Sequence, residues 1–129
     1  MKVYVASSFR NVGTVRTICG LLERRGCTIA YDWTGCGQSP TIAQLKEIGS
    51  AEIKAVREAD VIVVVLPAGK GSHVEMGIAL GLAKRIVLYS LNGEIRNPET
   101  TTTFYLLDEV ETCEGTLEEL VEAVCVAIS

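Results

Sequence analysis

The sequence is poor in the residues that build metal centres and disulfide frameworks. It has one histidine, and its five cysteines are scattered without any C-x-x-C spacing. A structural zinc site needs four cysteine or histidine ligands, so no metal and no cofactor are expected. The first residues have the pattern of a strand and not of a signal peptide. We therefore expect a cytoplasmic protein whose cysteines are reduced thiols, most of them core residues.

The chain also lacks long apolar runs and an excess of basic residues. No stretch reaches the roughly 18 apolar residues that predict a membrane-spanning helix. The 16 acidic and 12 basic side chains give a net charge of −4. This balance argues against a nucleic-acid polymer or an anionic membrane surface as a partner. A length of 129 residues predicts a single domain over 1–129.

Hydrophobic periodicity alternates between strand and helix along the chain. Strands are expected at 3–6, 27–31, 61–67, 85–90 and 110–113. Helices are expected from residue 12 to a cap at Gly26, and at 41–58, 72–84 and 116–128, with Thr116 as the last N-cap. The segment 32–41 is predicted to be a mobile polar loop, because it contains Gly35, Gly37 and Pro40. This order predicts a doubly wound α/β fold with a five-stranded parallel sheet in the order 2-1-3-4-5.

The most informative segment is the apolar run from Val61 to Pro67 with the glycine-bearing loop that follows it. Such a run is typical of a strand buried on both faces of a parallel sheet. Ligands of open α/β sheets bind beyond the carboxyl ends of the strands, where this sequence places Glu75. Gly69 and Gly71 can either cradle a phosphate at a helix N-terminus or serve the turn alone.

Glu75 also has a structural interpretation. Ser72 and Glu75 fit the capping box S-x-x-E, in which the two side chains satisfy each other's free backbone N–H groups. Spacing alone favours this interpretation, because capping boxes are common and catalytic glutamates are rare.

A second carboxylate stands out in the helix expected at 41–58. At about 100° per residue, Glu52 projects inside the apolar arc, between Ile48 and Val56. A carboxylate there must be paired, protonated or turned into a cavity, unless drift of the helix puts it at the edge of the arc. The functional and structural interpretations are evenly balanced.

Together these residues resemble the nucleoside 2-deoxyribosyltransferase superfamily, nearest to the 2′-deoxynucleoside 5′-phosphate N-hydrolases and to uncharacterised bacterial and phage members. The resemblance rests on Tyr4-Val5-Ala6-Ser7-Ser8-Phe9-Arg10, on Glu52 eight residues before Asp60, on Ala59-Asp60-Val61 and on Gly71-x-x-x-Glu75-x-Gly77. Two positions depart from the family pattern: Glu52 stands where aspartate is usual, and Ser7 where the hydrolases carry glycine.

The resemblance implies cleavage of the N-glycosidic bond of a nucleoside or nucleoside 5′-monophosphate, by hydrolysis or transfer, without a cofactor. Glu75 would be the nucleophile, Glu52 the acid–base or orienting carboxylate, and Tyr4 a neighbour of the sugar. The substrate-binding residues would come from two loops: Ser7, Ser8, Phe9 and Arg10, and then Gly69, Gly71, Ser72 and His73. The resemblance also implies a homodimer or higher homo-oligomer whose subunits complete each other's pocket.

A second class stays open, namely a non-catalytic module that binds a nucleotide or an ADP-ribose-like ligand. In that module Glu75 is only a cap, and Glu52 has no reason to lie in an apolar arc. Three further residues have smaller roles in these interpretations. Asp60 is expected to anchor the entry of the third strand, Trp33 either stacks on a base or covers the sheet edge, and Asn92 lies near the crevice.

Overall fold

The computed structural model describes residues 1–36 and 39–126. Its strands are β1 (Lys2–Ser7), β2 (Thr28–Ile29), β3 (Val61–Val65), β4 (Arg85–Tyr89) and β5 (Val110–Cys113). Its α-helices are α1 (Val12–Arg24), α2 (Ile42–Glu58), α3 (Lys70–Gly81) and α4 (Leu117–Cys125). Three 3₁₀ turns complete the described elements: η1 (Phe9–Asn11), η2 (Trp33–Gly35) and η3 (Thr103–Leu106).

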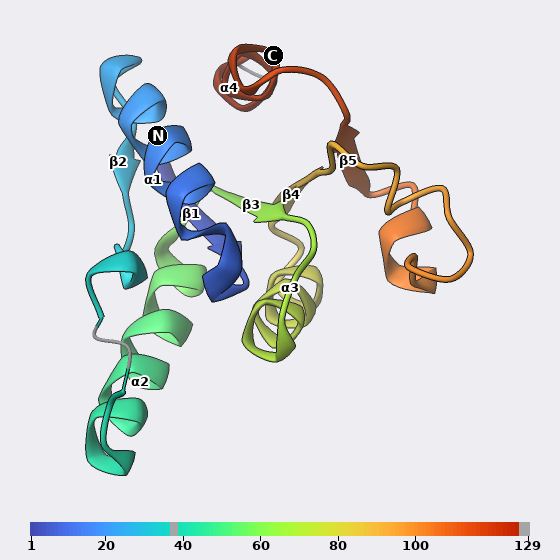
Figure 1. Cartoon of the computed structure of the whole chain (residues 1–129). Coiled ribbons are helices and arrows are strands. Elements are labelled where there is room, and N and C mark those ends of the chain that lie inside the picture. The colour runs from blue at the N-terminus through green and yellow to red at the C-terminus, as the bar shows by residue number, and fades with distance from the viewer. Residues whose placement is uncertain (37–38, 127–129) are drawn as a thin grey trace.

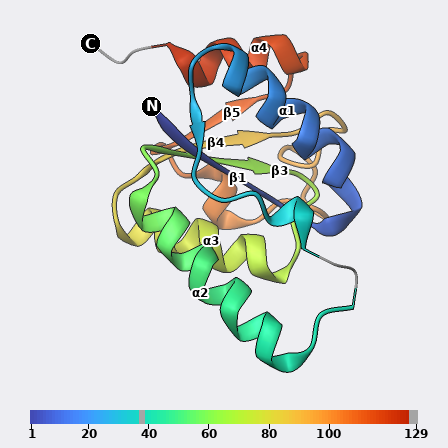
Figure 2. The same ribbon diagram turned by 90° about the vertical axis from the view of Figure 1, so that its left-hand side faces the viewer.

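The five strands form one parallel sheet in the order β2-β1-β3-β4-β5. This confirms the predicted fold class and strand order. Helices α1 and α4 cover one face of the sheet, and α2 and α3 cover the other (Figures 1 and 2). The carboxyl ends of β1 and β3 therefore meet at one edge, in the crevice where such folds bind ligands.

The central strand β3 has the burial that its sequence predicts. All five of its residues are buried, because helices cover the sheet on both sides. Its entry is fixed by Asp60, whose carboxylate accepts the backbone N–H of Lys2 at 2.8 Å. The predicted anchoring role of Asp60 is confirmed.

The element boundaries differ most from the predictions in four segments. The second strand is reduced to Thr28–Ile29, since it lies at the sheet edge and pairs only with β1. Within the predicted polar loop 32–41, Trp33 and Thr34 are buried in η2; Gly37 lies outside the described residues. Helix α3 begins at Lys70, two residues earlier than predicted, and ends at Gly81. The last helix has the predicted Thr116 cap and ends at Cys125, while residues 127–129 lie outside the described part.

Helix α2 is the largest departure from the expected packing. Its amino-terminal half extends past the sheet (Figure 2), and Ile42 and Leu45 are 83% and 49% exposed. Only Ala55 and Val56, near its carboxyl end, are buried. The predicted apolar arc is therefore core at one end of the helix and exposed surface at the other. No helix in the described ranges has the length and apolar character to cross a membrane.

Candidate functional site

Three polar side chains meet between the sheet and the helices α2 and α3. Tyr4 is completely buried in β1, and its hydroxyl donates a hydrogen bond to Glu75 of α3. The same hydroxyl lies 3.3 Å from Oε2 of Glu52 on α2. The structure thus brings together the three residues predicted to be catalytic, from three elements far apart in the sequence.

The start of α3 explains the position of Glu75. The N-cap is Gly69, and its backbone N–H donates to Oγ of Ser72 at 2.7 Å. The Ser72 side chain therefore caps the helix by accepting a hydrogen bond from the N-cap residue, Gly69. Glu75 lies in the second turn of the helix and faces Tyr4. The capping-box interpretation of Glu75 is wrong, because it requires Ser72 as the N-cap and the N-cap is Gly69, three residues earlier.

Burial dominates the electrostatics of this cluster. Glu75 is 7% exposed. Burial raises its pKa to about 8; the hydrogen bond from Tyr4 opposes this rise, and the charge of Glu52 adds to it. Burial and the charge of Glu75 also raise the pKa of the Tyr4 phenol, which stays protonated as a donor. The cluster therefore holds a proton at neutral pH.

Glu52 is less enclosed than its place in the apolar arc predicted. It is only partly buried and lies between two cavities. One cavity, of about 470 Å³, runs between α2 and α3 and is lined by Glu52, Glu75, Ile53 and Val74, among others. The buried apolar setting expected around Glu52 belongs instead to Glu75, because Glu75 lies deeper, against the sheet.

The other cavity, of about 530 Å³, is mostly apolar. It is lined by Phe9, Trp33, Cys36, Pro40, Leu45, Ile48 and Glu52. The rings of Phe9 and Trp33 are 6.0 Å apart, and the indole N–H of Trp33 donates to the Val5 carbonyl at 2.7 Å. This aromatic cavity combines a fixed indole with a partly exposed phenyl ring. The pairing of Phe9 with Trp33 was not predicted, since no local pattern links the loop after β1 to η2.

The loop after β1 is bonded to the loop after β3. Ser7 Oγ donates to the Val65 carbonyl at 2.8 Å, and Ser8 Oγ donates to the Pro67 carbonyl at 3.1 Å. Asn11, which the sequence analysis missed, bridges the same two loops through its side-chain amide, at 2.8 Å from Ser7 Oγ and 3.0 Å from the Pro67 carbonyl.

Gly69 lies where the two loops meet. A Cβ at this position would lie 3.4 Å from Cβ of Ser8, at the limit of ordinary contact. Gly71 has open space around its Cα, and Arg10 is exposed beside the loop. The predicted substrate-binding residues of the two loops therefore lie close together, and their contacts with a substrate stay predictions.

His73 is engaged on another side of α3. Its Nδ1 lies 2.8 Å from the Gly69 carbonyl and its Nε2 2.6 Å from the hydroxyl of Tyr105. The His73 and Tyr105 rings are stacked, with centroids 5.8 Å apart. His73 thus ties the start of α3 to the loop after β4 and lines a different cavity from Glu75.

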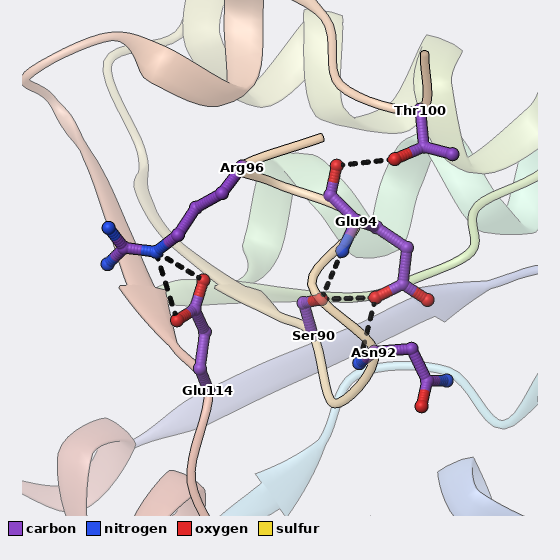
Figure 3. A network of polar contacts seen from close by, with 6 residues as sticks. All are labelled: Ser90, Asn92, Glu94, Arg96, Thr100 and Glu114. Atoms are coloured by element: carbon purple, nitrogen blue, oxygen red, sulfur yellow. Dashed lines mark hydrogen bonds and ion pairs between the residues drawn. The ribbon is translucent and has the colours of Figure 1, made fainter. Parts of the chain in front are cut away.

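The loop after β4 is ordered by a polar network around Glu94 (Figure 3). The Glu94 carboxylate accepts hydrogen bonds from Ser90 Oγ and from the Asn92 backbone N–H. Burial alone would raise the pKa of Glu94, but these hydrogen bonds outweigh it and lower the pKa. Thr100 Oγ1 donates to the Glu94 carbonyl at 2.8 Å. Asn92 itself is exposed, and its backbone N–H joins it to the network.

Within residues 1–36 and 39–126, no group of three or more histidine, cysteine, aspartate or glutamate side chains could hold a metal ion. Fold and site together define a doubly wound α/β domain with a tyrosine–carboxylate cluster between its sheet and the helices α2 and α3.

Comparison with known proteins identifies the family of this chain. The family model for nucleoside 2-deoxyribosyltransferase matches residues 3–113, and the chain belongs to that family. A search of curated protein sequences finds no match.

Solved structures with the same fold include the CMP N-glycosidase BcmB of Clostridium botulinum, at 16% identity and a TM-score of 0.64 over 98% of this chain and 100% of the other. A 2-deoxyribosyltransferase of Bacillus psychrosaccharolyticus is also similar, at 16% identity and a TM-score of 0.63 over 94% and 90% of the two chains. A conserved protein of Enterococcus faecalis V583 matches at 15% identity and a TM-score of 0.57 over 95% of each chain.

Proposed function

We propose that this protein cleaves the N-glycosidic bond of a nucleoside or nucleoside 5′-monophosphate, with Glu75 as the nucleophile. The observation that carries the proposal is the cluster of Tyr4, Glu52 and Glu75: two carboxylates and a phenol joined beside the cavity between α2 and α3. Family membership supports the same chemistry. A simple ligand-binding module has no use for a carboxylate buried at this cost in desolvation.

Glu75 attacks C1′ of the sugar, and the C1′–N bond breaks as its electron pair leaves with the base. The departing base takes a proton from Glu52, the more exposed of the two carboxylates. Tyr4 keeps its proton and orients Glu75 through their hydrogen bond. Because the free cluster already holds a proton, substrate binding has only to move it from Glu75 to Glu52 before the attack.

The surrounding groups suit the rest of such a substrate. The aromatic cavity beside Glu52 offers Phe9 and Trp33 to the flat face of a base. Ser8, Arg10 and Ser72 belong to the joined loops at the start of α3, where a helix N-terminus favours a phosphate. Water attacking the sugar–Glu75 ester gives hydrolysis, and a second base gives transfer.

We also propose that the protein works as a homodimer or higher homo-oligomer that uses the outer face of α2 and α3. We propose the cytoplasm as its location, where its five unbridged cysteines are reduced in the absence of an oxidant. Ile42 and Val74 on this face are 83% and 63% exposed. The cavity between the two helices opens on the same face, so a second copy would cover Glu52 and Glu75. Light scattering of the wild type and of Val74→Asp tests this proposal. A wild type that is monomeric at tens of micromolar contradicts it.

The decisive experiment incubates the pure protein with nucleosides and nucleoside 5′-monophosphates, with and without a second base, and measures released base by chromatography. Glu75→Gln should abolish release, and Glu47→Gln, an exposed change on α2, should leave it unchanged. No release from any substrate by the wild type, together with tight binding of a nucleotide, would favour the binding module. Full activity of Glu75→Gln would exclude Glu75 as the nucleophile.

A further inference from the structure

A pair of cysteines lies at the corner where α1, β2 and α4 meet. Cys27 precedes β2, Cys125 ends α4, and their sulfur atoms are 3.8 Å apart although 98 residues separate them in the sequence. Helices α1 and α4 lie side by side on this face of the sheet (Figure 2). The two thiols are therefore held together by the fold and not by their sequence spacing.

A second contact fixes the same corner. Arg25, in the turn after α1, donates from Nη1 to Oε2 of Glu122 at 2.9 Å. This turn ends at Gly26, whose φ of +86° favours glycine, and the Cys27 N–H then donates to the Leu22 carbonyl. Hydrogen bonds therefore hold the backbone of Cys27 in place and tie the turn before it to α4, the helix that ends at Cys125.

We propose that Cys27 and Cys125 form a reversible oxidation site, at which a small-molecule disulfide such as glutathione disulfide converts the two thiols into an intramolecular disulfide. A disulfide bond is about 2.0 Å long, so side-chain rotation has to bring the sulfur atoms together by less than about 2 Å. The site is separate from the Tyr4–Glu52–Glu75 cluster, since Cys27 lies before the amino end of β2. The inference therefore does not depend on the proposed function.

The order of steps follows from exposure. Cys125 is partly exposed and Cys27 is buried, so the Cys125 thiolate attacks the small disulfide first and releases one small thiol. Cys27 then attacks the Cys125 sulfur of the mixed disulfide and releases the second small thiol. In total, two protein thiols lose two electrons and two protons, and the small disulfide gains them. Burial raises the pKa of Cys125 and Arg25 opposes this rise, which makes the first step slow at neutral pH.

The test treats the folded protein with excess glutathione disulfide and measures thiols, mass and thermal stability. The expected result is the loss of two thiols and two hydrogens per chain, and reversal by a reducing agent. The melting temperature should rise by about 10 °C, because the cross-link closes a loop of nearly the full chain. Cleavage after Arg25 separates Cys19 from Cys27, cleavage at Asp32 separates Cys27 from Cys36, and cleavage after Glu122 separates Cys125 from Cys113. Peptide mapping therefore identifies the bond.

Cys125→Ser should abolish both the bond and the thermal shift, with Cys125→Ala as a second variant if the serine variant folds poorly. Cys113→Ser, which changes the partly buried cysteine of β5, is the matched control. This variant should keep both the disulfide bond and the rise in melting temperature. A stable glutathione adduct on Cys125, or a bond from Cys27 to the neighbouring Cys19, would overturn the proposal. Full retention of all five thiols under excess oxidant would overturn it as well.

Discussion

Replacing Glu75 by glutamine should stabilise the fold at alkaline pH while it removes the activity. The folded protein raises the pKa of Glu75 from 4.5 to about 8, chiefly by burial. Between these two values the native protein keeps the proton and the unfolded chain has released it. The contribution of Glu75 to the free energy of unfolding is therefore fully present below about pH 4.5 and is lost as the pH rises towards 8. Glutamine resembles the protonated acid and does not titrate, so the variant escapes this loss.

The size of the effect follows from linkage. An uncoupled group loses about 1.4 kcal/mol of stability for each pH unit across the window. Glu52 lies close enough to share the proton, which spreads the loss over a wider range. We expect Glu75→Gln to gain about 2 kcal/mol over the wild type between pH 5.5 and pH 8.5. This corresponds to roughly 8 °C in melting temperature for a domain of this size.

Urea unfolding at a series of pH values measures this difference directly, and Glu47→Gln on the exposed side of α2 is the control. Its stability curve should run parallel to that of the wild type. Base release should fall at least about a thousandfold in Glu75→Gln and stay unchanged in the control. Parallel curves for all three proteins would refute the assignment of a protonated Glu75 in the folded state.

Three other predictions concern turnover. First, kcat/KM should fall as the pH rises above about 8, because the free cluster then loses the proton that Glu52 has to give to the departing base; Glu52→Gln should lower kcat/KM and remove this fall, because it has no proton to donate. Second, Tyr4→Phe should move this fall to higher pH, because the hydrogen bond from Tyr4 lowers the pKa of Glu75, and it should lower kcat/KM at pH 7 by about tenfold to a hundredfold, since it removes a hydrogen bond to a carboxylate; an unshifted pH profile would contradict the role given to Tyr4. Third, Phe9→Ala should raise KM by about tenfold with little change in kcat, whereas Phe104→Ala, another exposed aromatic, should change neither.

The fold could be predicted because its signals are local. The uninterrupted apolar run of β3 and the alternation of strand and helix patterns led to the observed sheet order. The length of β2 could not be predicted in the same way, since a strand's extent depends on its partners. At the edge of the sheet, Thr28 and Ile29 pair only with β1.

The residues of the candidate site were predicted in part. The errors in that prediction concern where α3 begins and which distant segments come into contact. The three clustered residues were named from short motifs, yet the capping box at Ser72 was misplaced. Two glycines and a lysine (Gly69, Lys70 and Gly71) gave no clear boundary for α3, and an N-cap three residues before Ser72 turns Glu75 from a cap into a buried group. The aromatic cavity was missed for a similar reason. Trp33 becomes a wall of that cavity only because its indole is bonded to the Val5 carbonyl, a contact between distant segments.

The charges around the cluster indicate which reaction it is suited to accelerate. Across residues 1–36 and 39–126, no lysine, arginine or histidine forms an ion pair with Glu52 or Glu75. A carboxylate buried without a cationic partner is costly, and the fold avoids part of this cost by keeping Glu75 protonated. Its anion becomes favourable when a positive charge forms beside it, as it does on the sugar in the oxocarbenium-like transition state of glycosidic cleavage. A resident cation would stabilise the ionised resting enzyme as much as the transition state. Without one, the stabilisation is reserved for the transition state, which is the condition for a higher kcat.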